Sequence, residues 1–179
     1  MSGGRASGPA RLMSNCWVLV DGYNVLYSWP QFTSRKSRLR TLEQRREALL
    51  RVLQQYADQS GRQVTVVFDG YASKRKPPKG EAVAGMRAGR GLEVLFSDKG
   101  KTADEVIERV VALAPHPERI LVATSDNVER QIVETLGAQS MSAELFAVEV
   151  ADVLRELAAA VQHHGRRPRH SISGLREHF

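Results

Sequence analysis

Two short apolar segments, each followed by an Asp-Gly pair, constrain the fold of this chain most. Residues 16–20 read Cys-Trp-Val-Leu-Val before Asp21-Gly22, and residues 64–68 read Val-Thr-Val-Val-Phe before Asp69-Gly70. Neither segment shows the regular apolar and polar alternation of a strand with one wet face, so each predicts a strand buried on both faces. Such strands belong to parallel sheets that helices cover on both sides, which predicts an α/β fold.

Amphipathic segments lie between the predicted strands. Apolar residues recur at helical spacing over residues 41–59, and Gly61 follows as a stop signal. A strand, a helix and a second strand in this order form a right-handed crossover unit. The same patterns predict further strands at residues 92–96, 119–124 and 138–140, and further helices from Thr102, near residues 128–136 and over residues 142–162. The aromatic-rich residues 23–32, which include Pro30, predict a loop and a short helical turn.

Acidic residues follow the ends of these predicted strands. Asp21 and Asp69 follow the first two strands directly, Asp104 lies in the first turn of the helix after the third, and Asp126 follows the fourth. The carboxyl ends of parallel strands share one edge, where open α/β sheets bind ligands, so we expect these carboxylates to converge. Converging carboxylates repel unless a cation neutralises them, and oxygen ligands suit Mg²⁺ or Mn²⁺. The pattern therefore predicts a divalent metal site.

Each acid also has a purely structural interpretation. Asp-Gly after an apolar run is typical of hairpin turns, which applies to Asp21 and Asp69. Residues 102–105 match a capping box, in which Asp104 would only complement the helix dipole. Asp126 is similarly a candidate N-cap. Turn and cap chemistry does not require all four acids at one edge of one sheet, so their joint placement favours a site.

The composition is that of a basic, single-domain protein. The chain has 179 residues and a formal net charge of +6 at pH 7, which favours polyanionic partners such as nucleic acid. Its one cysteine, Cys16, excludes internal disulfides and a cysteine-built zinc site and fits a reducing, cytoplasmic setting. No apolar run reaches the length of a membrane span, so we expect no membrane partner.

Basic residues gather in one segment rich in glycine and proline. Residues 73–91 match no helix or strand pattern, which predicts a mobile basic loop that contacts an RNA backbone. The expected RNA-binding residues of this loop are Lys74, Arg75, Lys76, Lys79, Arg87 and Arg90. We expect residues 1–14 to be a disordered arm, residues 15–162 to form the folded domain, and residues 163–179 to be a basic tail.

Four motifs, in this order along the chain, resemble the NYN domain family, in its bacterial YacP-like branch. They are VDGYN at residues 20–24, VFD at 67–69, TADE at 102–105 and ATSD at 123–126. The resemblance covers roughly residues 16–160. It implies a PIN-like, three-layer α/β/α nuclease domain with a parallel five-stranded sheet in the order 3-2-1-4-5.

The same resemblance implies a metal-dependent ribonuclease site. Its catalytic positions correspond here to Asp21, Asn24, Asp104 and Asp126. The three acids among them would hold Mg²⁺ or Mn²⁺. Some family members carry a further acid about one helical turn after the last motif, where this chain has Glu129 and Arg130. The number of metal ions and the role of Asp69, a possible additional acid, therefore stay open.

The expected function is that of a Mg²⁺- or Mn²⁺-dependent endoribonuclease. The resemblance suggests mRNA as the substrate, in a setting associated with the ribosome. Aromatic residues of the chain would stack a base of the RNA, and the candidates are Tyr23, Tyr27, Trp29 and Tyr71. A non-catalytic RNA- or ribosome-binding module on the same fold is the alternative.

Overall fold

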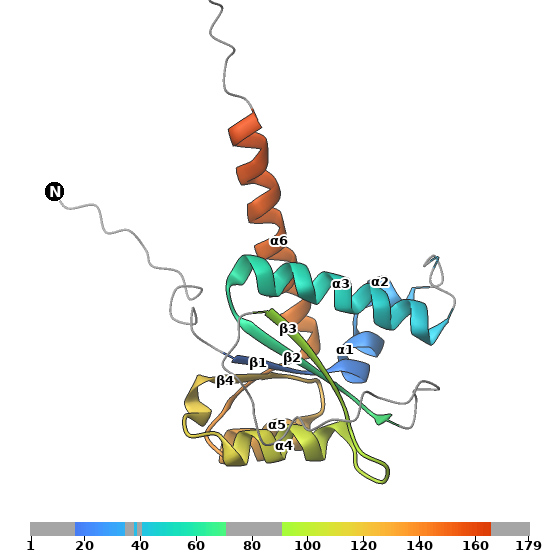
Figure 1. The fold of residues 1–179 in the computed structure, drawn as a ribbon, viewed down its shortest axis with the longest axis vertical. Helices are drawn as coiled ribbons and strands as arrows, with labels where there is room; N and C mark the ends of the chain where they lie inside the picture. The colour runs from blue at the N-terminus through green and yellow to red at the C-terminus, as the bar shows by residue number, and fades with distance from the viewer. Residues whose placement is uncertain (1–16, 35–37, 39–40, 71–90, 166–179) are drawn as a thin grey trace, which may run out of the picture.

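A computed structural model describes residues 17–34, 38, 41–70 and 91–165, with side chains described up to residue 156. Its centre is a five-stranded, all-parallel sheet in the order β3-β2-β1-β4-β5 (Figure 1). The strands are β1 (Trp17–Asp21), β2 (Gln63–Phe68), β3 (Gly91–Phe96), β4 (Ile120–Ala123) and β5 (Gln139–Met141). The predicted α/β class, parallel sheet and strand order are confirmed.

Helices cover both faces of this sheet. They are α1 (Gly22–Ser28), α2 (Pro30–Thr33), α3 (Leu42–Ser60), α4 (Ala103–Leu113), α5 (Asn127–Thr135) and α6 (Ala143–Gly165), with a short 3-10 turn η3 (Pro117–Arg119). Figure 1 shows α1, α3 and α6 on one face and α4 and α5 on the other. The result is a three-layer α/β/α arrangement, as the sequence predicts.

β1 occupies the centre of the sheet and contributes to both cores. Val18 and Val20 are fully buried beneath α1, α3 and α6, whereas Leu19 packs into the core under α4. Both neighbours of β1 are parallel to it: Val20 pairs with Val66 of β2 and with Ala123 of β4. Asp21, the last residue of β1, is therefore held at the middle of the carboxyl edge.

The prediction for residues 23–32 is wrong, because these residues form two helices, α1 and α2. The carboxylate of Asp21 accepts the N–H of Asn24 and caps α1, so the Asp-Gly pair starts a helix. Pro30 then occupies the first turn of α2, where its missing N–H costs nothing. The hairpin interpretation is wrong for Asp21 and Asp69 alike, because β1 leads into a helix and β2 pairs with a parallel β3.

Several predicted features lie outside the described residues. These are the arm at residues 1–14, the RNA-binding residues between Lys74 and Arg90, Tyr71, and the tail beyond residue 165. The final helix continues to Gly165, three residues past its predicted end at residue 162. None of the described helices is both long and apolar enough to cross a membrane.

Candidate metal centre

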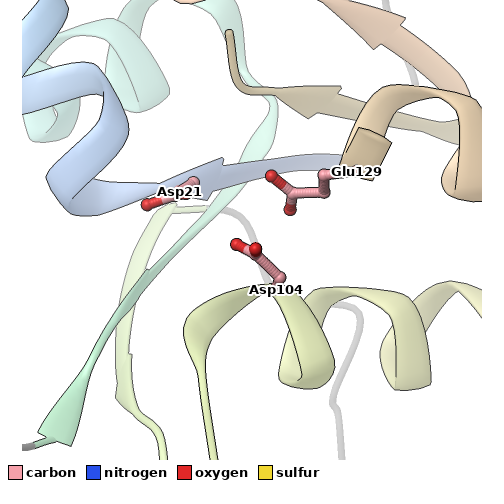
Figure 2. Close-up of side chains that lie close together, drawn as sticks. All are labelled: Asp21, Asp104 and Glu129. Carbon is pink, nitrogen blue, oxygen red and sulfur yellow. The ribbon is translucent and has the colours of Figure 1, made fainter. Parts of the chain in front are cut away.

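Three acidic side chains from three different elements meet at the carboxyl edge. Asp21 ends β1, Asp104 lies in the first turn of α4, and Glu129 lies in the first turn of α5. One carboxylate oxygen from each lies within 4.8 Å of the others. Figure 2 shows the three side chains pointing toward one another across the space between the strand and the two helices. We refer to Asp21, Asp104 and Glu129 as the acid cluster.

Asp21 is a largely desolvated member of this cluster. Its side chain belongs to a residue only 8% exposed, and burial raises the pKa of Asp21 to about 7. The hydrogen bond from the Asn24 N–H acts in the opposite direction, while the nearby charges of Asp104 and Asp69 raise the pKa further. In the protein without a cation, Asp21 therefore holds a proton far above the pH at which aspartates ordinarily lose it.

Glu129 is the most deeply buried acid of the cluster. It is 2% exposed, and neither of its carboxylate oxygens has a hydrogen-bond partner among the described residues. Burial raises the pKa of Glu129 to about 8, and the charges of Asp104 and Asp21 add to this effect. The Thr124 hydroxyl opposes it without reaching the geometry of a regular hydrogen bond. A buried carboxylate without partners is unfavourable unless a proton or a cation neutralises it. The cluster therefore fits a divalent cation.

Asp104 lies close to both of the other acids in the cluster. Burial raises the pKa of Asp104, the charges of Asp126 and Asp69 raise it further, and a side-chain hydrogen bond with Asp21 acts in the opposite direction. The charges of Asp21 and Asp104 oppose each other, so ionisation of one carboxyl group disfavours ionisation of the other. All the donors of the cluster are carboxylate oxygens, which favours hard ions such as Mg²⁺ or Mn²⁺ over zinc.

Asp126 takes a different place from the one expected. Its carboxylate accepts the N–H groups of Val128 and Glu129 and caps α5, and the residue is exposed. Its charge still raises the pKa of Asp104, so it lies near the cluster without belonging to it. The structure thus brings together two of the three predicted metal-holding acids and adds Glu129 as the third.

Glu129 is easily overlooked in the sequence because the buried side of α5 carries few of its apolar residues. Of the four apolar residues that predict this helix, Val128, Ile132 and Leu136 are 66%, 36% and 37% exposed, and only Val133 is buried. The inward face carries Glu129 and, one turn later, Val133. The (i, i+4) spacing of Glu129 from a buried valine is the signal in the sequence that places this acid inside.

Asp69 supports the cluster through α4. Its Oδ1 accepts the N–H of Ala103 at 2.7 Å, and the Thr102 hydroxyl accepts the N–H of Glu105 at 3.2 Å. The end of β2 therefore holds the start of the helix that carries Asp104. The capping interpretation of Thr102 is confirmed, and Asp69 acts on the orientation of α4.

Asn24 links the two sides of the carboxyl edge. Its Oδ1 accepts the N–H of Ser125 at 2.8 Å, which joins α1 to the loop between β4 and α5. The Ser125 hydroxyl in turn donates to Glu144 and accepts the N–H of Ala143 at the start of α6. The Asn24 amide thus fixes the loop that leads to Glu129, and no carboxylate contacts it in the described part of the chain.

The three layers, the strand order and the acids at the carboxyl edge define a PIN-like α/β domain with a candidate cation site. The chain belongs to the YacP-like NYN domain family, whose model matches residues 18–176. Membership of this family supports a nuclease-type role that involves RNA.

Individual relatives agree with this assignment. The chain is 33% identical over 146 residues to the uncharacterised protein YacP of Bacillus subtilis (strain 168), a match that covers 81% of each chain. It also matches the crystal structure of Rae1 (YacP) from Bacillus subtilis with a TM-score of 0.64 and 32% identity, over 82% of this chain and 80% of that one. A single-substitution mutant of Rae1 matches with a TM-score of 0.66 and 30% identity, over 86% of both chains.

Proposed function

We propose that this chain is a divalent-cation-dependent endoribonuclease that hydrolyses phosphodiester bonds of RNA, with Mg²⁺ or Mn²⁺ as its cofactor. The observation that carries the proposal is the acid cluster, in which a buried Glu129 without partners faces Asp21 and Asp104. Capping of α1 accounts for the Asp21 carboxylate alone. The mutual repulsion of the three carboxylates would be relieved by a cation. The family of the chain makes RNA the substrate class.

Each residue has a distinct part in this proposal. Asp21, Asp104 and Glu129 hold the cation, and Asp126 adds negative charge beside Asp104. Asn24 keeps the loop before α5 in place. A bound Mg²⁺ or Mn²⁺ would supply Lewis-acid activation of the attacking water and stabilise the negative charge that develops on the phosphate. Hydrolysis of this kind leaves a 5′-phosphate and a 3′-hydroxyl.

The proposed setting follows from the resemblance of the chain to its family. We propose mRNA as the substrate, a cytoplasmic location and association with the ribosome. The lysines and arginines between residues 74 and 90 would contact the RNA backbone. The direct check is whether the purified chain sediments with ribosomes and cleaves mRNA bound to them.

A cleavage assay with structured and single-stranded RNA tests the enzyme itself. Asp104→Asn should abolish Mn²⁺-dependent cleavage and leave RNA binding nearly intact, because it removes one carboxylate from the cluster and no surface cation. Asp98→Asn is the matched control, since Asp98 is an exposed acid in the loop after β3 at the same edge. Cleavage by Asp104→Asn at the wild-type rate would refute the assignment.

The alternative function, a non-catalytic RNA- or ribosome-binding module, makes the opposite prediction. Such a module would bind RNA equally well in EDTA and would not cleave it with any divalent ion. Cleavage that appears with Mn²⁺ and disappears with EDTA would exclude the alternative.

A further inference from the structure

Arg46 of α3 lies over the last aromatic rings of two neighbouring strands. Its guanidinium carbon is 5.9 Å from the centre of the Phe68 ring and 5.6 Å from the centre of the Phe96 ring. Phe68 and Phe96 are register partners at the carboxyl ends of β2 and β3, and Asp69 follows Phe68 directly. The half-buried Arg46 is therefore held at the same edge of the sheet as the acid cluster.

This guanidinium has no carboxylate partner among the ion pairs of the described residues. Beside it lies Tyr23, whose hydroxyl oxygen is fully buried and interacts with the Arg46 side chain. Asp69 itself is engaged by the N–H of Ala103. A guanidinium that lies over aromatic rings and has no carboxylate partner among the described residues suits a phosphate group, whose oxygens accept its N–H donors.

An exposed aromatic ring lies next to Tyr23. Tyr27 is 58% exposed, and its ring stacks on that of Tyr23 with centroids 6.3 Å apart and an interplanar angle of 27°. Tyr23 in turn packs edge-on against Phe68 at 5.0 Å. Of the aromatics expected to stack a base, Tyr23 and Trp29 are buried, which leaves Tyr27 as the accessible ring within the described residues. A ring backed by other rings is a suitable platform for a nucleobase.

We propose that Arg46 and Tyr27, both of which contact the buried Tyr23, form a nucleotide-binding subsite beside the acid cluster. Arg46 binds a backbone phosphate, and Tyr27 stacks the base of a single-stranded RNA nucleotide that flanks the cleaved bond. The subsite rests on the proposed function for its substrate class. It extends that function by placing the RNA next to the face of the sheet that carries α1 and α3 (Figure 1).

Binding of a single-stranded oligoribonucleotide in EDTA, measured by fluorescence anisotropy over a range of salt concentrations, tests the phosphate contact. Arg46→Met keeps the apolar stem over the two rings and removes the charge. It should weaken binding about tenfold and lower the slope of log affinity against log salt by about 0.7, the value for one phosphate contact. Arg46→Lys should keep the slope, which separates loss of charge from misfolding. Arg51→Met is the control, because Arg51 is an exposed arginine of the same helix whose partner is Glu47.

The base contact is tested with the same RNA. Tyr27→Leu should weaken binding by about fivefold or more, and Tyr27→Trp should restore it because an aromatic face returns. Leu113→Ala, which removes an exposed apolar side chain from the end of α4, is the control.

The outcomes separate the subsite from the proposed function. Unchanged affinity and salt slope in Arg46→Met and Tyr27→Leu, with wild-type cleavage intact, would overturn the subsite alone. A wild-type chain that binds this RNA through Arg46 and Tyr27 but cleaves none with any divalent ion would confirm the subsite and refute the nuclease.

Discussion

At the scale of single residues, Glu129 determines what the carboxyl edge can do. It is 2% exposed and its carboxylate lacks hydrogen-bond partners within the described residues, so its ionised form opposes folding. The pKa of about 8 shows that a proton relieves part of this cost near neutral pH. A divalent cation would relieve it without the proton. Glu129 therefore lowers the stability of the cation-free domain, and in the proposed function it provides a ligand for the cation.

Replacing Glu129 with glutamine tests both effects, on the stability of the cation-free domain and on the response to the cation. In EDTA at pH 8.5, Glu129→Gln should raise the melting temperature, by about 2–4 °C for each kcal/mol gained, because it removes a buried charge. The same variant should lose most of the stabilisation that Mn²⁺ gives the wild type. Differential scanning calorimetry with and without Mn²⁺ measures both effects, with the exposed Glu156→Gln as control. A lower melting temperature in EDTA together with an unchanged response to Mn²⁺ would contradict the role of Glu129.

At the scale of elements, three helices begin at the edge where the acids gather. Asp21 caps α1, Asp126 caps α5, and Asp69 holds the first residue of α4. The positive ends of these helices face the carboxylates and offset part of their repulsion. The two interpretations of these acids, helix capping and cation binding, are therefore compatible, because helices begin at the same edge where a cation would be held.

The link between α1 and the loop before α5 gives a prediction at this scale. Asn24→Ala leaves the N–H of Ser125, in a half-buried loop, without its acceptor, which should lower the free energy of unfolding by about 1–3 kcal/mol. It should also weaken Mn²⁺ binding, because the loop leads to Glu129. Urea unfolding and Mn²⁺ titration measure the two effects. Asn127→Ala is the control, because Asn127 is an exposed asparagine two residues after Ser125. Equal behaviour of the two variants would mean that the Asn24 amide does not hold the loop.

The sequence predicts the elements better than it predicts the site. Buried strands that end in acids and helices with regular apolar spacing are local patterns, so strands, helices and the edge that holds Asp21 and Asp104 follow from them. The helix α1 is missed because aromatic residues and Pro30 dominate its composition, while the cap at Asp21 decides its start. Glu129 is missed as a ligand because three of the four apolar residues that predict α5, Val128, Ile132 and Leu136, lie on its exposed side. Which side of α5 is buried is set by the packing of the whole domain.

At the scale of the whole molecule, the protein combines a local concentration of negative charge with a net positive charge of +6. The acids of the cluster are buried or half-buried at one edge, whereas many of the basic residues belong to other segments of the chain, above all residues 74–90. The net positive charge therefore attracts a polyanion to the protein. The acid cluster repels the polyanion locally, and a bound cation would remove this repulsion.

The raised pKa values of the cluster make the stability of the cation-free protein depend on pH. Asp21 has a pKa of about 7 and Glu129 one of about 8 in the folded state, well above their ordinary values. From about pH 4 to pH 8 the folded state therefore binds more protons than the unfolded state, and the free energy of unfolding falls as the pH rises. Saturating Mg²⁺ or Mn²⁺ should flatten this fall, because the ion binds the ionised carboxylates.

Urea unfolding from pH 5 to pH 9, in EDTA and in Mn²⁺, measures this dependence. The double variant Asp21→Asn/Glu129→Gln should show a flatter profile than the wild type in EDTA. A wild-type stability that rises over this range in EDTA would contradict the raised pKa values.

The members of the acid cluster come from positions 21, 104 and 129, on a strand and two helices that lie on different parts of the chain. A polypeptide still being synthesised has no such cluster until all three segments have emerged and packed against one another. Fragments that end before α5 should therefore be inert toward RNA cleavage, and the activity proposed for this chain is confined to molecules in which α5 has been synthesised and packed against the sheet.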